Sequence, residues 1–415
     1  MSVDLDWLMQ QGADAVLLRP VYAAFSNVSH SLAVAVSGGG DSVALLHLAD
    51  RVARHRGQAL SAVTVDHGLR PEAAAEAAGV AAFCAARGIP HQTLRWDGTA
   101  AKGNIMAAAR AARYQLIADW ALGQGIDHVL VGHTADDEAE TVLLQLGRGA
   151  GVDGLAGLDP SMQRYGVKLS RPLWQTRRDD LRDYLTRHGV AWVDDPTNDD
   201  TRYLRPRLRA ARPDLDDLGL SVEALTQVAF AQKMAKAALD HYTRQEVDRH
   251  VVFDFGDAIL PQNLALPQDI ERRIWRSILG WIGGGPYAPR QSALDSLANS
   301  VRAGVDHTVH DCRITVRQGR VRVTREWNAV RDLVCGTQDL WDRRWRLEGP
   351  HDRRFCVRAL GADGLAQSPE WRASGQPRPT LLASPAVWQN DRLVAAPLAG
   401  FGSDWSVKLI EPHTT

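Results

Sequence analysis

The 415-residue sequence is poor in cysteine, and no two of its four cysteines are close enough to form a Cys-x-x-Cys pair. They are Cys84, Cys312, Cys335 and Cys356. This scarcity excludes a disulfide scaffold, a zinc ribbon and a closely spaced set of iron–sulfur ligands. The sequence has no apolar run long enough to span a bilayer. Its first 18 residues contain no Lys or Arg, which a secretory signal would need. We therefore expect a cytoplasmic protein.

An excess of charge of either sign is also absent. The chain has 48 Lys and Arg residues and 49 Asp and Glu residues, which gives a formal net charge of -1. Any surface that binds nucleic acid must therefore be a local patch. A hydrophobic fraction of 45% and a charged fraction of 23% are typical of a globular protein, and this length predicts two or three domains.

Short β-branched runs alternate with alanine-rich stretches between residues 32 and about 200. The predicted strands are 32–36, 61–66, 91–96, 128–132 and, more weakly, 167–173. The predicted helices are 43–54, 72–87, 104–122, 135–146 and 179–188. This alternation predicts an α/β fold with a doubly wound parallel sheet. In such sheets the ligand binds beyond the carboxyl ends of the strands, at the switch point.

The pattern changes after residue 212. We expect a hinge at 213–218, a long helix at 221–247 and a hairpin at 312–324, followed by short strands from about residue 340. The predicted domains are a catalytic domain at 1–212, a helix-rich middle domain of the all-α or α+β class at 213–332, and a small C-terminal α+β domain at 333–415. The last of these is rich in Trp and Arg, a mixture that suits contact with RNA, although tryptophans such as Trp341 and Trp345 can equally form a core.

The sharpest local motif lies between the first predicted strand and the first predicted helix. Its residues are Ser37, Gly38, Gly39, Gly40, Asp41 and Ser42. Three glycines let backbone N–H groups point inward, and the helix N-terminus adds positive partial charge, so the motif predicts a phosphate nest. No Gly-Lys-Ser/Thr follows, which excludes a Walker A loop.

Asp41 is informative because a carboxylate repels phosphate. Its place inside a phosphate nest makes sense if it holds Mg²⁺ against that phosphate. The alternative is a plain helix-capping turn, in which Ser37 and Asp41 only stabilise the helix dipole. We favour nucleotide binding.

A second acidic cluster, at 132–141, follows the fourth predicted strand. Thr134 is the expected N-cap, which places Asp136 and Asp137 in the first turn, and Glu140 shares a helix face with Asp136. Because the fourth strand of a doubly wound sheet lies beside the first, these carboxylates would face the glycine motif. They could complete a magnesium shell, capture a cationic substrate or accept a proton. Alternatively, they only complement the helix dipole.

Two basic segments are candidates for RNA contact. Arg110, Arg113 and Tyr114 share one face of the third predicted helix, although an isolated arginine pair is as often a solvated face. Before the predicted hinge lies a dense run made of Arg202, Arg205, Arg207, Arg209 and Arg212. Because like charges this close repel one another, the run predicts a polyanionic partner.

Taken in order, these motifs resemble those of the tRNA(Ile)-lysidine synthases, which belong to the N-type ATP-pyrophosphatase group. The matching blocks are SGGGDS (37–42), DHGLR (66–70), the 104–114 pattern ending in ARAARY, GHTADDEAET (132–141), RGAGVDGLAGL (148–158), RPL (171–173), VDDPTN (193–198) and the arginine run at 202–209. The resemblance is close over about 15–210 and looser beyond. Three positions depart from the family pattern. Thr134 stands in place of a second histidine, Glu138 in place of a glutamine, and Pro206 in place of an asparagine.

The resemblance implies a HUP-like catalytic domain and an ATP-dependent C–N ligase. Such an enzyme adenylates C2 of the wobble cytidine (position 34) of tRNA(Ile) with a CAU anticodon. It then attaches L-lysine, with release of AMP and pyrophosphate. The implied cofactors are ATP and Mg²⁺, and the implied partners are tRNA(Ile) and L-lysine. No membrane is expected to be involved, and the sequence does not decide whether the protein forms a homodimer.

The resemblance also implies roles for individual residues. The implied catalytic residues are Asp41, Asp136, Asp137, Glu140 and Arg113. The implied ATP-binding residues are those at 37–42 together with His67 and His133, although a lone histidine is more often structural. The implied metal ligands are Asp41 and Asp137. The implied RNA-binding residues are Arg110, Arg113, Arg205, Arg207 and Arg209.

Three other functions share part of this pattern. A tRNA thiolase of the same group needs clustered cysteines, whereas the catalytic half has only Cys84, in the middle of a predicted helix. An NAD or GMP synthetase would share the glycine motif but not the long basic C-terminal half. A noncatalytic nucleotide-binding or RNA-binding protein would have no need of both acidic clusters.

Overall fold

The computed structural model describes residues 4–26, 31–68, 73–96, 105–193, 202–285 and 288–410. Contacts divide the chain into two compact units, unit 1 at 1–236 and unit 2 at 237–415. Each unit is described by itself. None of the helices in these ranges is long and apolar enough to cross a membrane.

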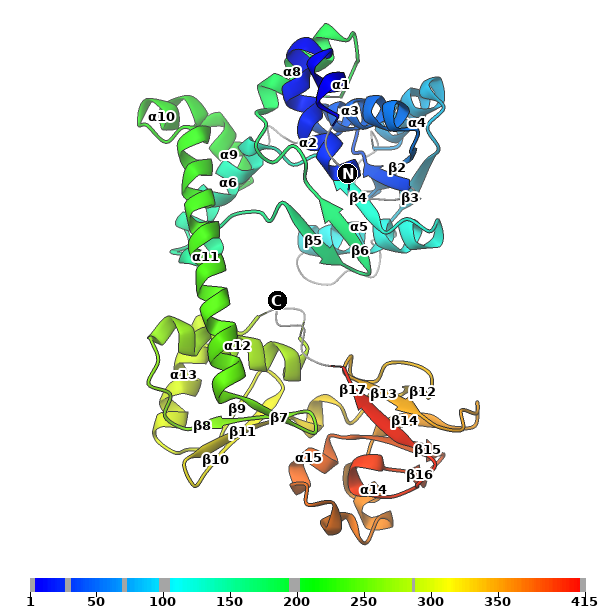
Figure 1. Ribbon diagram of the computed structural model, residues 1–415, viewed down its shortest axis with the longest axis vertical. Coiled ribbons are helices and arrows are strands. Elements are labelled where there is room, and N and C mark those ends of the chain that lie inside the picture. Colours follow the sequence, from blue (N-terminus) through cyan, green and yellow to red (C-terminus); the bar gives the residue numbers. More distant parts are fainter. Residues whose placement is uncertain are drawn as a thin grey trace. The chain divides into compact units, whose positions relative to one another are not determined.

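Within the described residues, unit 1 contains a six-stranded sheet with the order β3-β2-β1-β4-β6-β5 (Figure 1). The strands are β1 (Ser31–Ala35), β2 (Ala59–Asp66), β3 (His91–Arg95), β4 (His128–Val131), β5 (Ser161–Arg164) and β6 (Val167–Ser170). All neighbouring strands are parallel except β5, which is antiparallel to β6. The predicted parallel sheet is confirmed. The edge strand β5 was not predicted, because its sequence Ser-Met-Gln-Arg has little apolar character.

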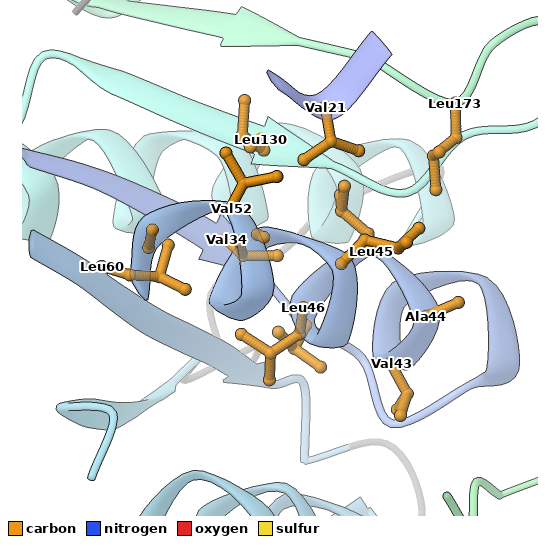
Figure 2. Close-up of a cluster of buried hydrophobic side chains, with 14 of the residues drawn as sticks. Val21, Val34, Val43, Ala44, Leu45, Leu46, Val52, Leu60, Leu130 and Leu173 are labelled. Carbon is orange, nitrogen blue, oxygen red and sulfur yellow. The ribbon is translucent and has the colours of Figure 1, made fainter. Parts of the chain in front are cut away.

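Helices cover both faces of this sheet. The helices described in unit 1 are α1 (Leu5–Met9), α2 (Ala15–Ser26), α3 (Gly40–Arg56), α4 (Ala73–Arg87), α5 (Ile105–Gly123), α6 (Ala135–Leu146), α7 (Val152–Leu155), α8 (Arg178–Arg187), α9 (Leu204–Ala210) and α10 (Arg212–Asp217), and α11 (Val222–His250) runs across the boundary between the units. Alternate residues of β1 enter different cores. Val34 packs with Leu45 and Leu46 of α3 (Figure 2), whereas Ala33 packs with Ile117 of α5. The sheet is therefore doubly wound, as predicted.

The predicted hinge at 213–218 is wrong. Residues 212–217 form helix α10, with Pro213 in its first turn. A proline is tolerated there because the N–H groups of a first turn have no partner within the helix. The long helix predicted at 221–247 is confirmed as α11, at Val222–His250.

Unit 2 begins with an antiparallel sheet of order β7-β8-β11-β10-β9 that packs against two helices. These elements are β7 (Val252–Asp254), β8 (Asp257–Pro261), α12 (Gln268–Gly283), α13 (Gln291–Arg302), β9 (His307–Val309), β10 (Cys312–Arg317) and β11 (Arg320–Arg325). The hairpin predicted at 312–324 is confirmed as β10–β11.

The C-terminal part of unit 2 combines small antiparallel sheets with short helices. Its elements are β12 (Cys335–Gly336), β13 (Trp345–Glu348), β14 (Cys356–Ala359), α14 (Gly361–Gln367), α15 (Arg378–Leu382), β15 (Pro385–Gln389), β16 (Arg392–Ala395) and β17 (Ser406–Leu409). Trp341 and Trp345 are buried in its core. Arg344 is also buried and pairs with Asp342 at 3.1 Å. These two tryptophans therefore form a core, and the alternative that they stack on RNA is wrong.

Candidate active site

A cavity of about 490 Å³ lies at the carboxyl ends of β1 and β4. Its wall contains five residues of the glycine motif: Ser37, Gly39, Gly40, Asp41 and Ser42. It also contains His133, which lies between β4 and α6, and three residues of α6, namely Asp136, Asp137 and Glu140. Arginines of further helices also line the cavity, among them Arg113 of α5, Arg178 of α8 and Arg209 of α9. The structure thus brings the two predicted clusters together at the switch point of the sheet.

The glycine motif is held in a compact turn by its two serines. The Ser42 hydroxyl accepts a hydrogen bond from the Ser37 N–H at 3.1 Å and donates one to the Gly39 carbonyl at 2.9 Å. Gly38 has φ of +92°, a conformation that side chains rarely adopt. Gly132, at the end of β4, lies so close that a Cβ atom there would meet the Ser42 Cα at 3.0 Å. Gly132 is therefore needed for the close approach of β4, and Gly38 for the conformation of the turn.

Thr134 and Asp137 start helix α6 with a reciprocal capping box. The Asp137 Oδ2 accepts the Thr134 N–H at 2.9 Å, and the Thr134 hydroxyl accepts the Asp137 N–H at 3.4 Å. The helix-capping alternative is thus partly right for Asp137. Its other oxygen, Oδ1, lies 3.2 Å from Arg178 and is available to the cavity. Thr134, where the family has a histidine, serves as the N-cap that was predicted.

Asp136 connects α6 to α8. Its Oδ2 accepts the backbone N–H of Arg178 at 2.8 Å and lies 3.6 Å from the Nε of Arg177. An acidic side chain at a helix N-terminus satisfies a free N–H group and complements the helix dipole. Asp136 therefore fixes the start of α8 against the wall of the cavity.

Arg178 joins the two acidic clusters and was missed in the sequence. Its guanidinium lies 3.0 Å from Asp41, 3.2 Å from Asp137 and 3.7 Å from Glu140. A cation in the first turn of a helix opposes the helix dipole. Two arginines at the predicted start of a helix, Arg177 and Arg178, could therefore have indicated in the sequence that these residues have a role other than stabilising the helix.

Burial and Arg178 act on the same carboxylates in opposite directions. Burial raises the pKa of Asp41, and Arg178 offsets this only in part. Burial would also raise the pKa of Asp137, but Arg178, His133 and the Thr134 N–H together lower it. Burial disfavours the charged form of Arg178, yet its carboxylate partners raise the pKa of the guanidinium. The pKa of Asp41 is therefore raised and that of Asp137 lowered, although both carboxylates lie beside the same guanidinium.

The arginine run before α10 is neutralised largely within the protein. Arg209 donates to Glu140 at 2.6 Å, Arg205 lies 4.0 Å from the same carboxylate, and Arg212 pairs with Asp216 at 2.8 Å. Carboxylates of the protein therefore supply part of the counter-charge, and RNA contact through Arg205 and Arg209 stays a prediction. Arg207 is exposed, and RNA contact through it stays a prediction. Pro206 is buried at the third residue of α9, where its missing N–H costs no intrahelical bond.

The two candidate histidines lie in different surroundings. His133 lines the cavity, and its Nδ1 accepts a hydrogen bond from the Nε of Arg171 at 3.3 Å. Burial lowers the pKa of His133 to about 4, so the ring is neutral at physiological pH. His67 is not among the described residues that line the cavity. It packs edge-on against Trp96, and burial together with Arg113 lowers its pKa.

Arg113 differs from every arginine described above. It lines the cavity, and no described residue provides it with a carboxylate partner. Burial, together with the neighbouring Arg110, lowers the pKa of its guanidinium. A half-buried cation that has no counter-ion among the described residues is a ready site for an anionic ligand. Asn104, residues 69–70 of DHGLR and residues 194–198 of VDDPTN lie outside the described residues.

Comparisons with known proteins agree with this geometry. A family model described as a PP-loop domain matches residues 14–213. The tRNA(Ile)-lysidine synthase of Ruegeria pomeroyi is 46% identical over 380 residues, which cover 91% of each chain. That of Wolbachia pipientis wMel is 34% identical over 359 residues, covering 85% of this chain and 82% of the relative. Among solved structures, a U34-tRNA thiolase from Methanococcus maripaludis is similar with a TM-score of 0.45 and 17% identity, over 55% of this chain and 80% of that one. The chain belongs to the family of tRNA(Ile)-lysidine synthases and carries a PP-loop domain in its first half.

Proposed function

We propose that this protein is an ATP-dependent ligase that forms lysidine in tRNA(Ile). ATP adenylates the C2 oxygen of the cytidine at position 34 of a CAU anticodon, and L-lysine then replaces AMP at C2. The observation that carries the proposal is the meeting of the glycine motif, the α6 carboxylates and Arg113 in one cavity of about 490 Å³. We further propose that it works in the cytoplasm, with the three domains divided at 212 and 332.

The glycine motif would bind the phosphates of ATP. Its backbone N–H groups, the Ser37 and Ser42 hydroxyls and the N-terminus of the 17-residue helix α3 all offer positive partial charge to an anion. In the adenylation step, the C2 oxygen attacks the α-phosphorus and pyrophosphate leaves. Donors fixed before the reaction stabilise the charge that develops on this leaving group.

Asp41 and Asp137 would hold Mg²⁺. Their fit to the ion rests on the donor chemistry, because both are carboxylates and both already attract one guanidinium, that of Arg178. The described residues contain no group of three or more potential ligands arranged for a metal, as expected for an ion held by one or two carboxylates together with substrate phosphates. When bound, Mg²⁺ would neutralise phosphate charge.

The acidic face of the cavity would receive lysine. The ε-amine is mostly protonated at neutral pH, because its reference pKa is about 10.4, and it must lose a proton before it attacks C2. Asp136, Asp137 and Glu140 line the cavity together, so they can bind the ammonium group and accept that proton. Arg113, on another element of the wall, would compensate the phosphate of the adenylated base and of the departing AMP.

The thiolase alternative is less well supported. Cys84, which lies in the catalytic half, is fully buried within α4, and burial raises its pKa to about 11. A thiol in that environment is neither a nucleophile nor a ligand for a cluster at physiological pH.

The test is pyrophosphate release by the purified protein, with ATP, L-lysine and tRNA(Ile) supplied together or with one omitted. We expect release coupled to lysidine formation only when all three are present. Release with glutamine or ammonia in the absence of RNA would instead assign the protein to an amide-forming synthetase. Binding of ATP or RNA without turnover would indicate a binding protein.

A further inference from the structure

The hairpin that joins β5 to β6 presents an aromatic ring in an unfavourable backbone conformation. Arg164 pairs with Val167, so Tyr165 and Gly166 form a two-residue turn. Their φ angles are +52° and +84°, a geometry in which Asn-Gly or Asp-Gly is the usual sequence. Tyrosine is disfavoured at the first of these positions, yet its side chain is 40% exposed and not needed for a core. Phe255 holds the same position of the β7–β8 turn at φ of +48° and is also exposed, so the backbone conformation alone does not mark a functional residue. What distinguishes the Tyr165 turn is its charged surroundings.

Arginines surround this turn. The Arg164 guanidinium lies over the ring of Tyr165 at 5.0 Å and over that of Tyr114 at 4.8 Å. Arg110 of α5 lies over the same Tyr114 ring at 5.5 Å, so the two guanidinium carbons are no more than about 10 Å apart. Within the described residues, neither arginine has a carboxylate partner. We call Arg110, Tyr114, Arg164 and Tyr165 the Tyr165 surface.

The Tyr165 surface is continuous with the wall of the cavity. Arg113, which lines the cavity, is three residues from Arg110 on α5 and therefore lies on the same side of that helix. On the other side, the buried Arg171 bonds both to His133 in the cavity wall and to the Asp159 carbonyl just before β5. Its guanidinium also contacts the Met162 sulfur at 3.4 Å. The position of β5 is thus fixed relative to the site.

We propose that the Tyr165 surface binds the single-stranded RNA that flanks the reacting base. This inference rests on the proposed function. Unpaired loop bases stack on aromatic side chains and arginine planes, and Tyr165 offers an exposed ring beside Arg164. Arg110 and Arg164 contact backbone phosphates, which supply the missing counter-charge. A local patch of this kind is what a chain with a net charge of -1 requires in order to bind RNA.

A second hairpin of the same shape lacks these features. The β10–β11 turn has Gln318 and Gly319 at φ of +51° and +72°, flanked by Arg317 and Arg320. Arg317 is neutralised by two hydrogen bonds to Asp306, at 2.6 and 2.8 Å. The same turn therefore occurs with a polar residue at the tip and a paired arginine, and Arg317 provides a matched control.

The first test replaces Tyr165 in the full-length protein. Tyr165→Asn removes the ring and introduces a residue that tolerates the left-handed region, so the melting temperature should not fall. We expect the Kd for tRNA(Ile), measured by filter binding, to rise about tenfold because one stacked base is lost. The Kd for ATP should stay unchanged. Tyr165→Phe, which retains the ring, should bind tRNA like the wild type.

The second test removes charge. Arg164→Gln should lower the slope of log Kd against log salt by about one, because one phosphate contact is lost. Arg317→Gln should leave the slope unchanged. Wild-type affinity of Tyr165→Asn for tRNA, or an unaltered salt slope in Arg164→Gln, overturns the inference. The inference is also overturned if either variant weakens ATP binding as much as tRNA binding and lowers the melting temperature, because the hairpin is then only structural. If the wild-type protein forms no lysidine, it is the proposed function that fails.

Discussion

Arginines lie on two sides of the cavity, but they differ in whether a carboxylate of the protein pairs with them. On the side of α6, α8 and α9, arginines pair with carboxylates: Arg178 contacts three of them, and Arg209 lies 2.6 Å from Glu140. On the side of α5, Arg113 has no carboxylate partner among the described residues, and the same holds for Arg164 on the Tyr165 surface outside the cavity. We call these the paired side and the unpaired side.

This difference indicates a division of labour. Paired carboxylates keep their negative charge in a buried place, and they can exchange one cation for another, which suits Mg²⁺ and the lysine ammonium. Unpaired guanidinium groups pay a desolvation cost that only an anion offsets, which suits ATP and the RNA backbone. Residue type alone does not separate the two roles, because both sides use arginine.

The strongest test of the paired side is Asp41→Asn. This change removes the charge at the centre of the proposed metal site and should lower turnover at least about a thousandfold. tRNA binding should change less than twofold, because Asp41 lies on the other side of the cavity from the proposed RNA contacts. Single-turnover lysidine formation and filter binding measure the two effects.

Asp50→Asn is the matched control for this change. Asp50 lies on the same helix and pairs with Arg54 at 2.8 Å, outside the cavity wall. It should retain near wild-type turnover. Near wild-type turnover in Asp41→Asn would remove the proposed metal role.

Arg178→Met tests whether the paired side needs its shared cation. Without the guanidinium, Asp41, Asp137 and Glu140 repel one another, so we expect the site to lose its arrangement and kcat/KM to fall about a hundredfold. Arg178→Lys should recover only part of this loss, because one ammonium group cannot reach three carboxylates in the same geometry.

Arg187→Met provides the control on the same helix. Arg187 pairs with Asp14 at 3.1 Å, far along α8 from Arg178. We expect a lower melting temperature with kcat/KM within about twofold of the wild type. If both variants lost activity equally, Arg178 would be important for folding and not for the site.

Much of this arrangement could be predicted from the sequence. The alternation of strands and helices predicted the sheet, and the strand-end positions of residues 37–42 and 132–141 predicted that the two clusters would meet. Both predictions rest on local features of the sequence: the periodicity of apolar residues, the run of glycines and the helix-capping residues. Strand β5 was missed because it is short and has one apolar residue, Met162, among three polar ones, which gives no periodic signal.

The fate of individual charges could not be predicted in this way. The arginine run at 202–212 predicted a polyanionic partner, but the sequence did not show that Arg209 and Arg205 also pair with Glu140. Arg178 drew no attention, yet it joins both acidic clusters. Pairing depends on which elements pack together, and that is a long-range property. Trp341 and Trp345 illustrate the same limit, because only packing decides between a core and a binding surface.

A third prediction concerns Glu138, which faces away from the cavity on the paired side. Its buried carboxylate forms an ion pair with Lys233 and accepts the Leu158 N–H at 2.6 Å. Lys233→Met should lower the free energy of unfolding by about 3 kcal/mol, because a buried carboxylate is left without its cation. The measurement is urea denaturation.

The double variant Glu138→Gln with Lys233→Met should recover most of this loss. Glutamine keeps an acceptor for the Leu158 N–H and carries no charge that needs a partner. If the double variant were as unstable as Lys233→Met, lost packing and not the unpaired charge would explain the effect.

The smallest expected effect is a change in the pH dependence of stability where α8 packs on α3. Burial, together with Arg87, His188 and Arg51, lowers the pKa of His47 to about 4, and its Nδ1 lies 2.7 Å from the Tyr184 hydroxyl. The folded pKa is below the unfolded value of about 6.5, so the unfolded state binds more protons between these values. Stability therefore falls as pH drops from about 6.5 to about 4, by at most about 1.4 kcal/mol per pH unit from this residue.

His47→Gln should flatten the fall in melting temperature over that range, and His241→Gln, at an exposed position of α11, should leave it unchanged. The nearby Asp14 does not confound the measurement, because the pKa of its carboxylate is lowered to about 2, so its stabilising effect is lost only below about pH 3.8. A curve for His47→Gln that matches the wild type would show that acid acts elsewhere. The loss of stability in acid would then not come from the contact of α8 with α3.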